Sequence, residues 1–208
     1  MRTLTSVELF DGAFKGNCFA NCLNKNKTCF VVRESMKRIL VIGSSGSGKS
    51  TFARHLGEAT GLEVIHLEKL FWNPNWIETS KDEWKIKVKK ALQGDSWIID
   101  GNYSGTMDVR LPACDTVIFL DMPRITCIYR VLKRVALYRK GSRPDLVEGC
   151  DEKFDWQFIK LTWNYPTRSK QKVEALLKRF ENKINVIRLK SKKETENFFA
   201  NYSKERNP

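Results

Sequence analysis

Residues 43–50 match the pattern G-x-x-x-x-G-K-[ST] at every position, with the sequence Gly-Ser-Ser-Gly-Ser-Gly-Lys-Ser. They follow a short apolar run, 38–43, and precede a segment in which Phe52 and Leu56 have helical spacing. A buried strand, a glycine-rich turn and a helix N-terminus are therefore expected in this order. Backbone N–H groups in such a turn converge on one anion, and the helix dipole adds positive potential. An ordinary Gly/Ser turn is the alternative, but pattern and flanks together favour a phosphate-binding loop.

A loop of this kind predicts that the chain binds ATP together with Mg²⁺. The Lys49 ammonium is expected to reach the β and γ phosphate oxygens, and the Ser50 hydroxyl is expected to ligate Mg²⁺. The predicted nucleotide-binding residues are Gly43, Ser44, Ser45, Gly46, Ser47, Gly48, Lys49, Ser50 and Thr51.

Two later apolar runs end in aspartate, at Asp100 and Asp121, and neither aspartate is followed by glutamate. Motor and transporter ATPases usually place a glutamate there to polarise a water molecule. A GTPase would carry Asn-Lys-x-Asp after a late strand, but the nearest approach, 182–185, lacks the aspartate. A phosphate-binding loop without a hydrolytic glutamate favours transfer of phosphate to an acceptor. These absences therefore point to a kinase.

From Met36 onward, apolar runs alternate with segments of helical periodicity. The expected strands are 38–43, 62–67, 97–100, 116–121 and 184–189, and the main expected helices are 49–60, 80–92, 125–138, 151–164 and 169–182, with a last one from 191. This alternation predicts the α/β class and the P-loop NTPase fold, with a five-stranded parallel sheet and helices on both faces. Ligands are then expected at the carboxyl ends of the strands.

Residues 1–35 differ from the rest because they show neither a helical nor a strand period. We predict that they form an atypical extension outside the fold and that the domain covers 36–208. No apolar run approaches the 18 residues of a membrane span, and the N-terminus lacks the apolar stretch of a secretory signal. The six cysteines include no CxxC pair. These patterns predict a cytoplasmic protein with no membrane partner.

The positive charge is concentrated in the last part of the chain. Residues 124–208 hold 21 basic and 10 acidic side chains and so contribute +11 of the net +13. A basic surface attracts polyanions, either free nucleotides or a nucleic-acid backbone. Basic helices that face solvent are the alternative for most of the late lysines.

Beyond the loop, several sequence blocks resemble one family. They are 43–51, His66-Leu-Glu-Lys-Leu-Phe-Trp72, Trp97-Ile-Ile-Asp-Gly-Asn-Tyr103, Phe119-Leu-Asp-Met-Pro-Arg124 and Arg139-Lys-Gly-Ser-Arg-Pro144. With them the chain resembles the adenylate-kinase-like family of DNA topology modulation proteins (FlaR type), short relatives of nucleoside and nucleotide kinases. The resemblance covers 36–200 and nothing of 1–35. One departure is Glu68, where relatives commonly have aspartate. The extra methylene of glutamate keeps the negative charge but moves it, so an acceptor-binding or base role for Glu68 would act from a different position.

The resemblance also implies roles for charged residues. In similar kinases a carboxylate at the place of Asp100 holds Mg²⁺, usually through water, whereas a local hydrogen-bonding role is the alternative. Adenylate kinases place two arginines at the spacing of Arg130 and Arg134, one over the base and one on the phosphates. Arg139 and Arg143 would then complete an Arg-rich helical lid over the transferring phosphoryl group. A basic helix facing solvent is the alternative for each arginine.

The acceptor side is expected to be lined by 66–76 and 101–110. The side chains singled out there are Glu68, Trp72 and Arg110, with Arg110 expected to neutralise an acceptor phosphate. Trp72 either stacks on a base or sugar or packs against the sheet. His66 is interpreted as a core histidine at a strand end. Core packing is also predicted for three apolar residues at helical spacing, Phe154, Phe158 and Leu161.

Three functions are compatible with these patterns. The leading hypothesis is a Mg²⁺-dependent phosphotransferase that moves the γ-phosphate of ATP to a small acceptor, a nucleoside or a nucleotide. The second is a nucleotide-regulated DNA-binding protein that uses the basic half of the chain, although no nucleic-acid-binding motif is present. The third is a nucleotide binder that has lost its activity, with Glu68 as the reason.

Overall fold

The computed structural model describes residues 36–138, 147, 149–150 and 153–206. The backbone falls into two units, Met1–Val31 and Val32–Pro208, and the described residues all belong to the second. The strands are β1 (Arg38–Gly43), β2 (Val64–His66), β3 (Trp72–Asn73), β4 (Ile77–Glu78), β5 (Trp97–Asp100), β6 (Thr116–Leu120) and β7 (Asn185–Leu189). The helices are α1 (Lys49–Thr60), α2 (Leu67–Phe71), α3 (Lys81–Ala91), α4 (Met107–Ala113), α5 (Arg124–Leu137), α6 (Trp156–Trp163), α7 (Ser169–Arg179) and α8 (Lys192–Arg206), with short 3-10 turns at Pro74–Trp76 and Ser104–Thr106.

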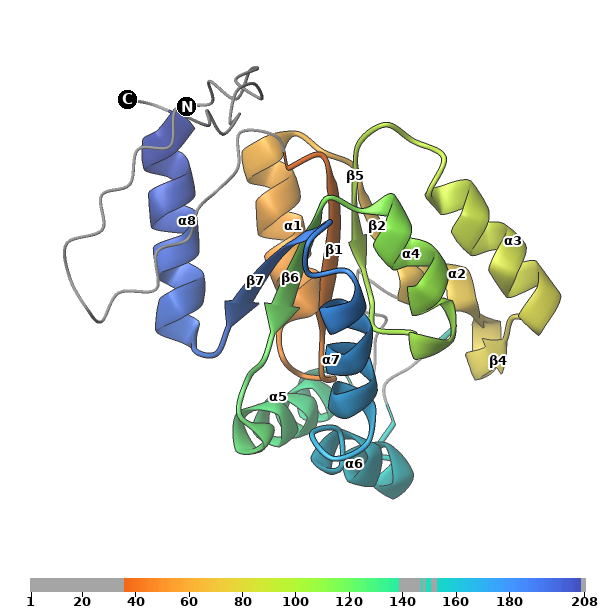
Figure 1. Cartoon of the computed structure of the whole chain (residues 1–208). Coiled ribbons are helices and arrows are strands. Elements are labelled where there is room, and N and C mark those ends of the chain that lie inside the picture. Colours follow the sequence, from red (N-terminus) through yellow and green to blue (C-terminus); the bar gives the residue numbers. More distant parts are fainter. Residues whose placement is uncertain (1–35, 139–146, 148, 151–152, 207–208) are drawn as a thin grey trace, which may run out of the picture. The chain divides into compact units, whose positions relative to one another are not determined.

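Five strands form one parallel sheet in the order β2-β5-β1-β6-β7, and each of them is labelled in Figure 1. The central strands β5, β1 and β6 are almost wholly buried, which explains why their sequences are continuous apolar runs. The register aligns Val41 with Asp100 and Gly43 with Leu120, so the ends of these strands share one edge. The predicted α/β fold with a five-stranded parallel sheet is confirmed.

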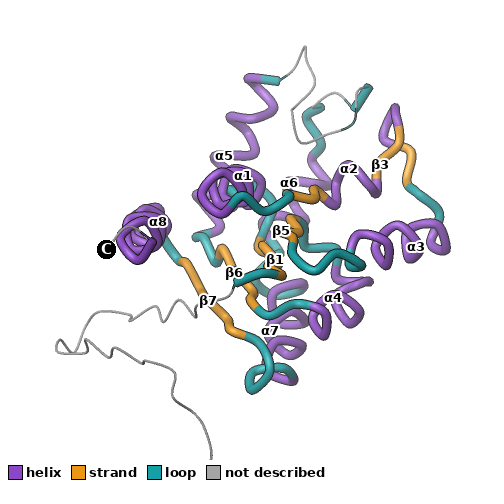
Figure 2. The backbone as a smooth tube through the Cα atoms, turned by 90° about the horizontal axis from the view of Figure 1, so that it is seen from above, coloured by secondary structure: helices purple, strands orange, loops and turns teal. Residues whose placement is uncertain are grey.

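Helices cover both faces of this sheet (Figure 2). Helices α1 and α8 lie on one side, where the ring of Phe52 is 5.4 Å from that of Phe198 and 4.9 Å from that of Phe199. Helices α3, α4 and α7 lie on the other side and share a core that includes Trp84 and Leu111. No helix in the described part of the chain is long and apolar enough to cross a membrane.

Helices α5 and α6 lie beyond the carboxyl ends of the strands (Figure 1) and pack on each other. Helix α6 begins at Trp156, later than the predicted start at 151. Sequence reasoning missed the antiparallel hairpin of β3 and β4, in which Trp72 pairs with Glu78. Strands of two residues are too short to show a period, and the turn between them depends on the left-handed backbone of Asn75 and Trp76.

Replacing Phe198 with alanine tests the packing of α8 on α1. The ring is 1% exposed and contacts Phe52, so its loss should lower the free energy of unfolding by about 3–5 kcal/mol. The control is Phe154→Ala, because that ring is 60% exposed and its removal should change stability by less than about 0.5 kcal/mol. Urea unfolding of both variants gives the two values, and equal effects would contradict the packing.

Candidate functional site

The turn between β1 and α1 is held tightly against α5. Gly46 has a φ of 73°, and a Cβ added there would lie 2.3 Å from the carbonyl oxygen of Cys127. Only glycine fits this position, because both the backbone conformation and the neighbouring carbonyl exclude a side chain. The turn is closed by the Ser47 N–H, which donates to the Ser44 carbonyl at 3.1 Å. The glycine-rich turn therefore takes its shape from its neighbour α5 as well as from its own sequence.

Two cations are attached to this turn. The Lys49 ammonium donates to the Ser44 carbonyl at 3.0 Å, and the Arg130 guanidinium donates to the Ser47 carbonyl at 2.9 Å. Helix α1 begins at Lys49 and has no acidic residue in its first turn, so no side chain of that turn neutralises the positive end of its dipole. The turn thus presents concentrated positive potential, as an anion site requires.

A first cavity of about 470 Å³ lies over this turn. Its lining residues are Ser45, Gly46, Gly48, Lys49, Ser50, Thr51, Arg54, His66, Glu68, Arg130, Arg134 and Tyr138. Four of these are lysine or arginine, and Glu68 is the one carboxylate among them. Arg130 and Arg134 of α5 therefore line the same cavity as the predicted nucleotide-binding loop. Arg139 and Arg143 of the predicted lid lie outside the described residues.

A second cavity of about 620 Å³ adjoins the first. Its lining residues are Gly43, Ser44, Ser45, Lys49, Glu68, Trp72, Asn102, Tyr103, Ser104, Phe158, Leu161, Thr162, Tyr165, Thr167, Arg168, Ser169, Gln171 and Lys172. Ser45, Lys49 and Glu68 line both cavities. The two cavities therefore meet at a lysine and a carboxylate, with the glycine-rich turn lining both. Of the predicted loop residues, Ser47 lines neither cavity and is 1% exposed.

The Asp100 carboxylate lies at the end of β5, beside the end of β2. Its Oδ2 accepts a hydrogen bond of 2.9 Å from Nδ1 of His66, which is half-buried and lines the first cavity. Its Oδ1 is buried and accepts no hydrogen bond from any described residue. Asp100 itself lines neither cavity, so this spare oxygen would act on a Mg²⁺ beside the Ser50 hydroxyl of the first cavity only through water. Within the described residues, no three side chains of His, Cys, Asp or Glu gather closely enough to hold a metal ion alone.

Arg110 does not lie where the sequence predicted. Its side chain is 0% exposed, lines neither cavity and donates hydrogen bonds of 2.8–2.9 Å to the carbonyls of Gly101, Asn102 and Tyr103. Burial lowers the pKa of Arg110 to about 10, so the guanidinium stays charged at neutral pH. A buried cation engaged by three carbonyls supports the loop after β5, and this burial is why it does not face an acceptor phosphate.

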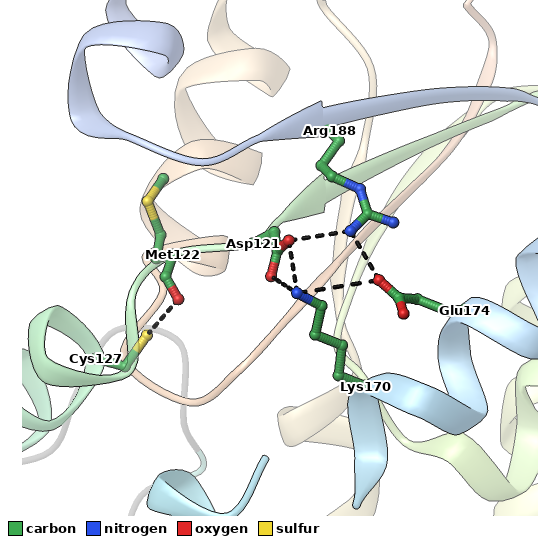
Figure 3. A network of polar contacts seen from close by, with 6 residues as sticks. All are labelled: Asp121, Met122, Cys127, Lys170, Glu174 and Arg188. Carbon is green, nitrogen blue, oxygen red and sulfur yellow. Dashed lines mark hydrogen bonds and ion pairs between the residues drawn. The ribbon is translucent and has the colours of Figure 1, made fainter. Parts of the chain in front are cut away.

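Asp121, which occupies the place of Asp100 on the other side of β1, is engaged in an ion network (Figure 3). Its oxygens lie 2.8 Å from the Lys170 ammonium and 3.0 Å from the Arg188 guanidinium. Arg188 also contacts Glu174 at 2.8 Å. The network ties the end of β6 to β7 and α7, so the Asp121 carboxylate already has two cationic partners.

Aromatic side chains form much of the second cavity. Trp72 stands edge-on to Trp76 with ring centroids 5.3 Å apart. Burial, helped by the nearby Glu68 carboxylate, raises the pKa of Tyr103 above its ordinary value, so its hydroxyl stays neutral. Phe158 and Leu161 of α6 line this cavity. Their predicted role in the core is therefore wrong, because the apolar face of α6 borders a cavity.

The third residue of that predicted core group, Phe154, is 60% exposed and precedes α6. Sequence reasoning also missed cavity residues on both sides of α7's start, notably Tyr165, Arg168 and Lys172. Only the density of basic residues near α7 could have drawn attention to Arg168 and Lys172, and that pattern is equally typical of a solvated surface.

No protein-family model and no curated protein matches this chain. Among solved structures, it is similar to deoxyadenosine kinase from M. mycoides with bound dATP, with 17% identity, a TM-score of 0.45 and coverage of 79% of this chain and 98% of that chain. The same kinase with the products dCMP and a flexible dCDP gives 16% identity, a TM-score of 0.44 and coverage of 80% and 98%. Identities this low assign no activity, and the resemblance to the DNA topology modulation family stays an expectation.

Replacing Arg110 with alanine distinguishes a supporting role from a ligand-binding one. The variant leaves the carbonyls of Gly101 and Asn102 without the Arg110 donor, while Tyr103 keeps its hydrogen bonds from Thr106. It also empties the space of a fully buried side chain, so the free energy of unfolding should fall by about 3 kcal/mol or more. The matched control is Arg54→Ala, which removes an exposed cation and should cost less than about 1 kcal/mol. Both values are measured by urea unfolding. Unchanged stability of the Arg110 variant would contradict the supporting role and favour the predicted role in binding the acceptor.

Proposed function

We propose that this chain is an ATP-dependent phosphotransferase that moves the γ-phosphate of ATP to a small acceptor, a nucleoside or a nucleotide. The observation that carries this proposal is the pair of adjoining cavities that share Ser45, Lys49 and Glu68. A group-transfer enzyme needs two ligands whose reacting atoms meet at one place. A cavity for each ligand, joined at the lysine of the phosphate-binding turn, supports that arrangement.

The first cavity is the donor site in this proposal. The backbone N–H groups of the turn and the Lys49 ammonium would bind the β and γ phosphates, while Arg130 and Arg134 of α5 line the same cavity. Ser50 and Asp100 would hold Mg²⁺, which neutralises phosphate charge when it is bound. A guanidinium can stack on a base or bind phosphate oxygens, and both arginines line the cavity in which these groups would lie.

The second cavity is the acceptor site. During transfer the bond between the γ-phosphorus and the β–γ bridging oxygen breaks, a bond to the acceptor oxygen forms, and ADP leaves. Glu68 lies where the cavities meet and can take the proton of an acceptor hydroxyl. Lys49 would neutralise charge on the transferring group, so catalysis consists mainly of positioning and electrostatic stabilisation. The aromatic walls would keep water from competing with the acceptor.

Replacing Lys49 with alanine should reduce phosphoryl transfer by about a hundredfold or more, because it removes the cation shared by both cavities. The fold should remain intact, since within the described residues the Lys49 ammonium donates one hydrogen bond, to the Ser44 carbonyl. Lys89→Ala on α3 removes the same charge at an exposed position outside both cavities and serves as the control. Product formation from Mg·ATP measures the effect, and turnover equal to that of the control would refute the assignment of this turn.

The excess positive charge of residues 124–208 favours one other function, nucleotide-regulated binding of DNA. Replacing Arg134 with alanine separates the two, because this residue lines the first cavity. We expect turnover to fall by about tenfold or more, since a charged hydrogen bond contributes about 1.5–3 kcal/mol. Affinity for duplex DNA and its salt dependence should change little. Retained turnover combined with weaker DNA binding and a flatter salt slope would favour the DNA-binding function instead.

A further inference from the structure

Two cations that line the second cavity have no role in the proposed mechanism. Arg168 immediately precedes α7, Lys172 lies in its first turn, and both line the cavity. Neither side chain has a hydrogen bond or an ion pair with another part of the chain that the structure describes. Lys170, between them, differs because its ammonium is held by Asp121 at 2.8 Å (Figure 3).

The cations at the start of α7 thus have two different environments. Lys170 supports the fold, whereas Arg168 and Lys172, four residues apart, lie on one side of the helix and border the cavity. Three of the residues that line this cavity are cationic, Lys49, Arg168 and Lys172, and Glu68 is the single carboxylate among them. The electrostatic potential of the cavity therefore favours an anion.

Other residues that line the second cavity favour the binding of a planar ring. Trp72, Tyr103 and Phe158 line the same cavity and offer aromatic surface. A ligand that satisfies both kinds of wall has a planar ring and a negatively charged group. The cavity of about 620 Å³ is within the range of small-ligand sites.

We propose that Arg168 and Lys172 form the part of the acceptor site that recognises an anionic phosphate, so that a nucleoside monophosphate is the preferred acceptor. This inference rests on the proposed phosphotransferase function and narrows it. A guanidinium binds two phosphate oxygens at once, and the ammonium adds a second charged donor. An oxygen of this bound phosphate is the acceptor atom in the proposal: it forms the new bond to the γ-phosphorus while the bond to the β–γ bridging oxygen breaks and ADP leaves. Arg168 and Lys172 hold the accepting phosphate, and Lys49 of the same cavity neutralises the transferring group. A phosphate oxygen needs no base, so Glu68 would take a proton only from a nucleoside acceptor.

The test uses the full chain with Mg·ATP and matched pairs of acceptors, each of four nucleosides beside its 5′-monophosphate. The unaltered protein should use the best monophosphate with a kcat/KM about tenfold or more above that of its nucleoside. Arg168→Gln and Lys172→Gln should each lower kcat/KM for the monophosphate by about tenfold or more, with a higher KM as part of that loss. Activity on the nucleoside should not change.

The matched controls are Lys178→Gln and Arg179→Gln. They remove the same charge from the last turn of the same helix, where both side chains are exposed and lie outside the cavity. Neither control should change KM for the monophosphate. Equal effects in all four variants would show that net charge acts at long range, and that result would overturn the proposal.

A preference for neutral nucleosides, unaffected by either cavity substitution, would also overturn the proposal while leaving the phosphotransferase function in place. If no acceptor is phosphorylated, the phosphotransferase function itself fails. Calorimetric titration with the nucleoside monophosphates then decides the role of the pair. Binding that is lost in Arg168→Gln and Lys172→Gln but kept in the two controls supports the anion site, and binding that is absent or equal in all four variants refutes it.

Discussion

The close contact between the glycine-rich turn and α5 is the constraint on which the candidate site depends. Gly46 approaches the Cys127 carbonyl so closely that an added Cβ would be 2.3 Å from it, and one at Gly43 would be 2.5 Å from the Leu120 carbonyl. These contacts bring the turn, the end of β6 and the start of α5 together. Because of them, Arg130 on the next turn of α5 reaches the Ser47 carbonyl, and the first cavity acquires a cationic wall.

Two aspartates that are alike in the sequence have different partners in the structure. Asp121 is neutralised by Lys170 and Arg188, so its charge stabilises the junction of β6, β7 and α7. Asp100 has one partner, His66, and keeps a buried oxygen that accepts no hydrogen bond from the described residues. A buried carboxylate oxygen without a donor is costly unless a ligand satisfies it. This difference is the physical reason for proposing the magnesium role for Asp100 and not for Asp121.

The sequence predicted the sheet and the turn because both depend on local patterns. A buried parallel strand is a continuous apolar run, and the turn needs glycine and lysine at fixed positions. The cavity walls were less predictable. Phe158 and Leu161 have the helical spacing of core residues, and this spacing cannot distinguish a core from a cavity wall. Arg110 resembles an anion-binding arginine in the sequence, whereas its three carbonyl partners become apparent only when the loop after β5 is folded.

The basic half of the chain is therefore not a uniform charged surface. Lys170 and Arg188 are neutralised by Asp121 and Glu174, and Arg130 is attached to the turn. Arg168 and Lys172 border a cavity of limited volume. Duplex DNA binds to cations spread over an exposed surface, because its phosphates recur along the whole helix. Cations that line one cavity instead match a ligand with one compact anionic group, which is the arrangement that the proposed acceptor site requires.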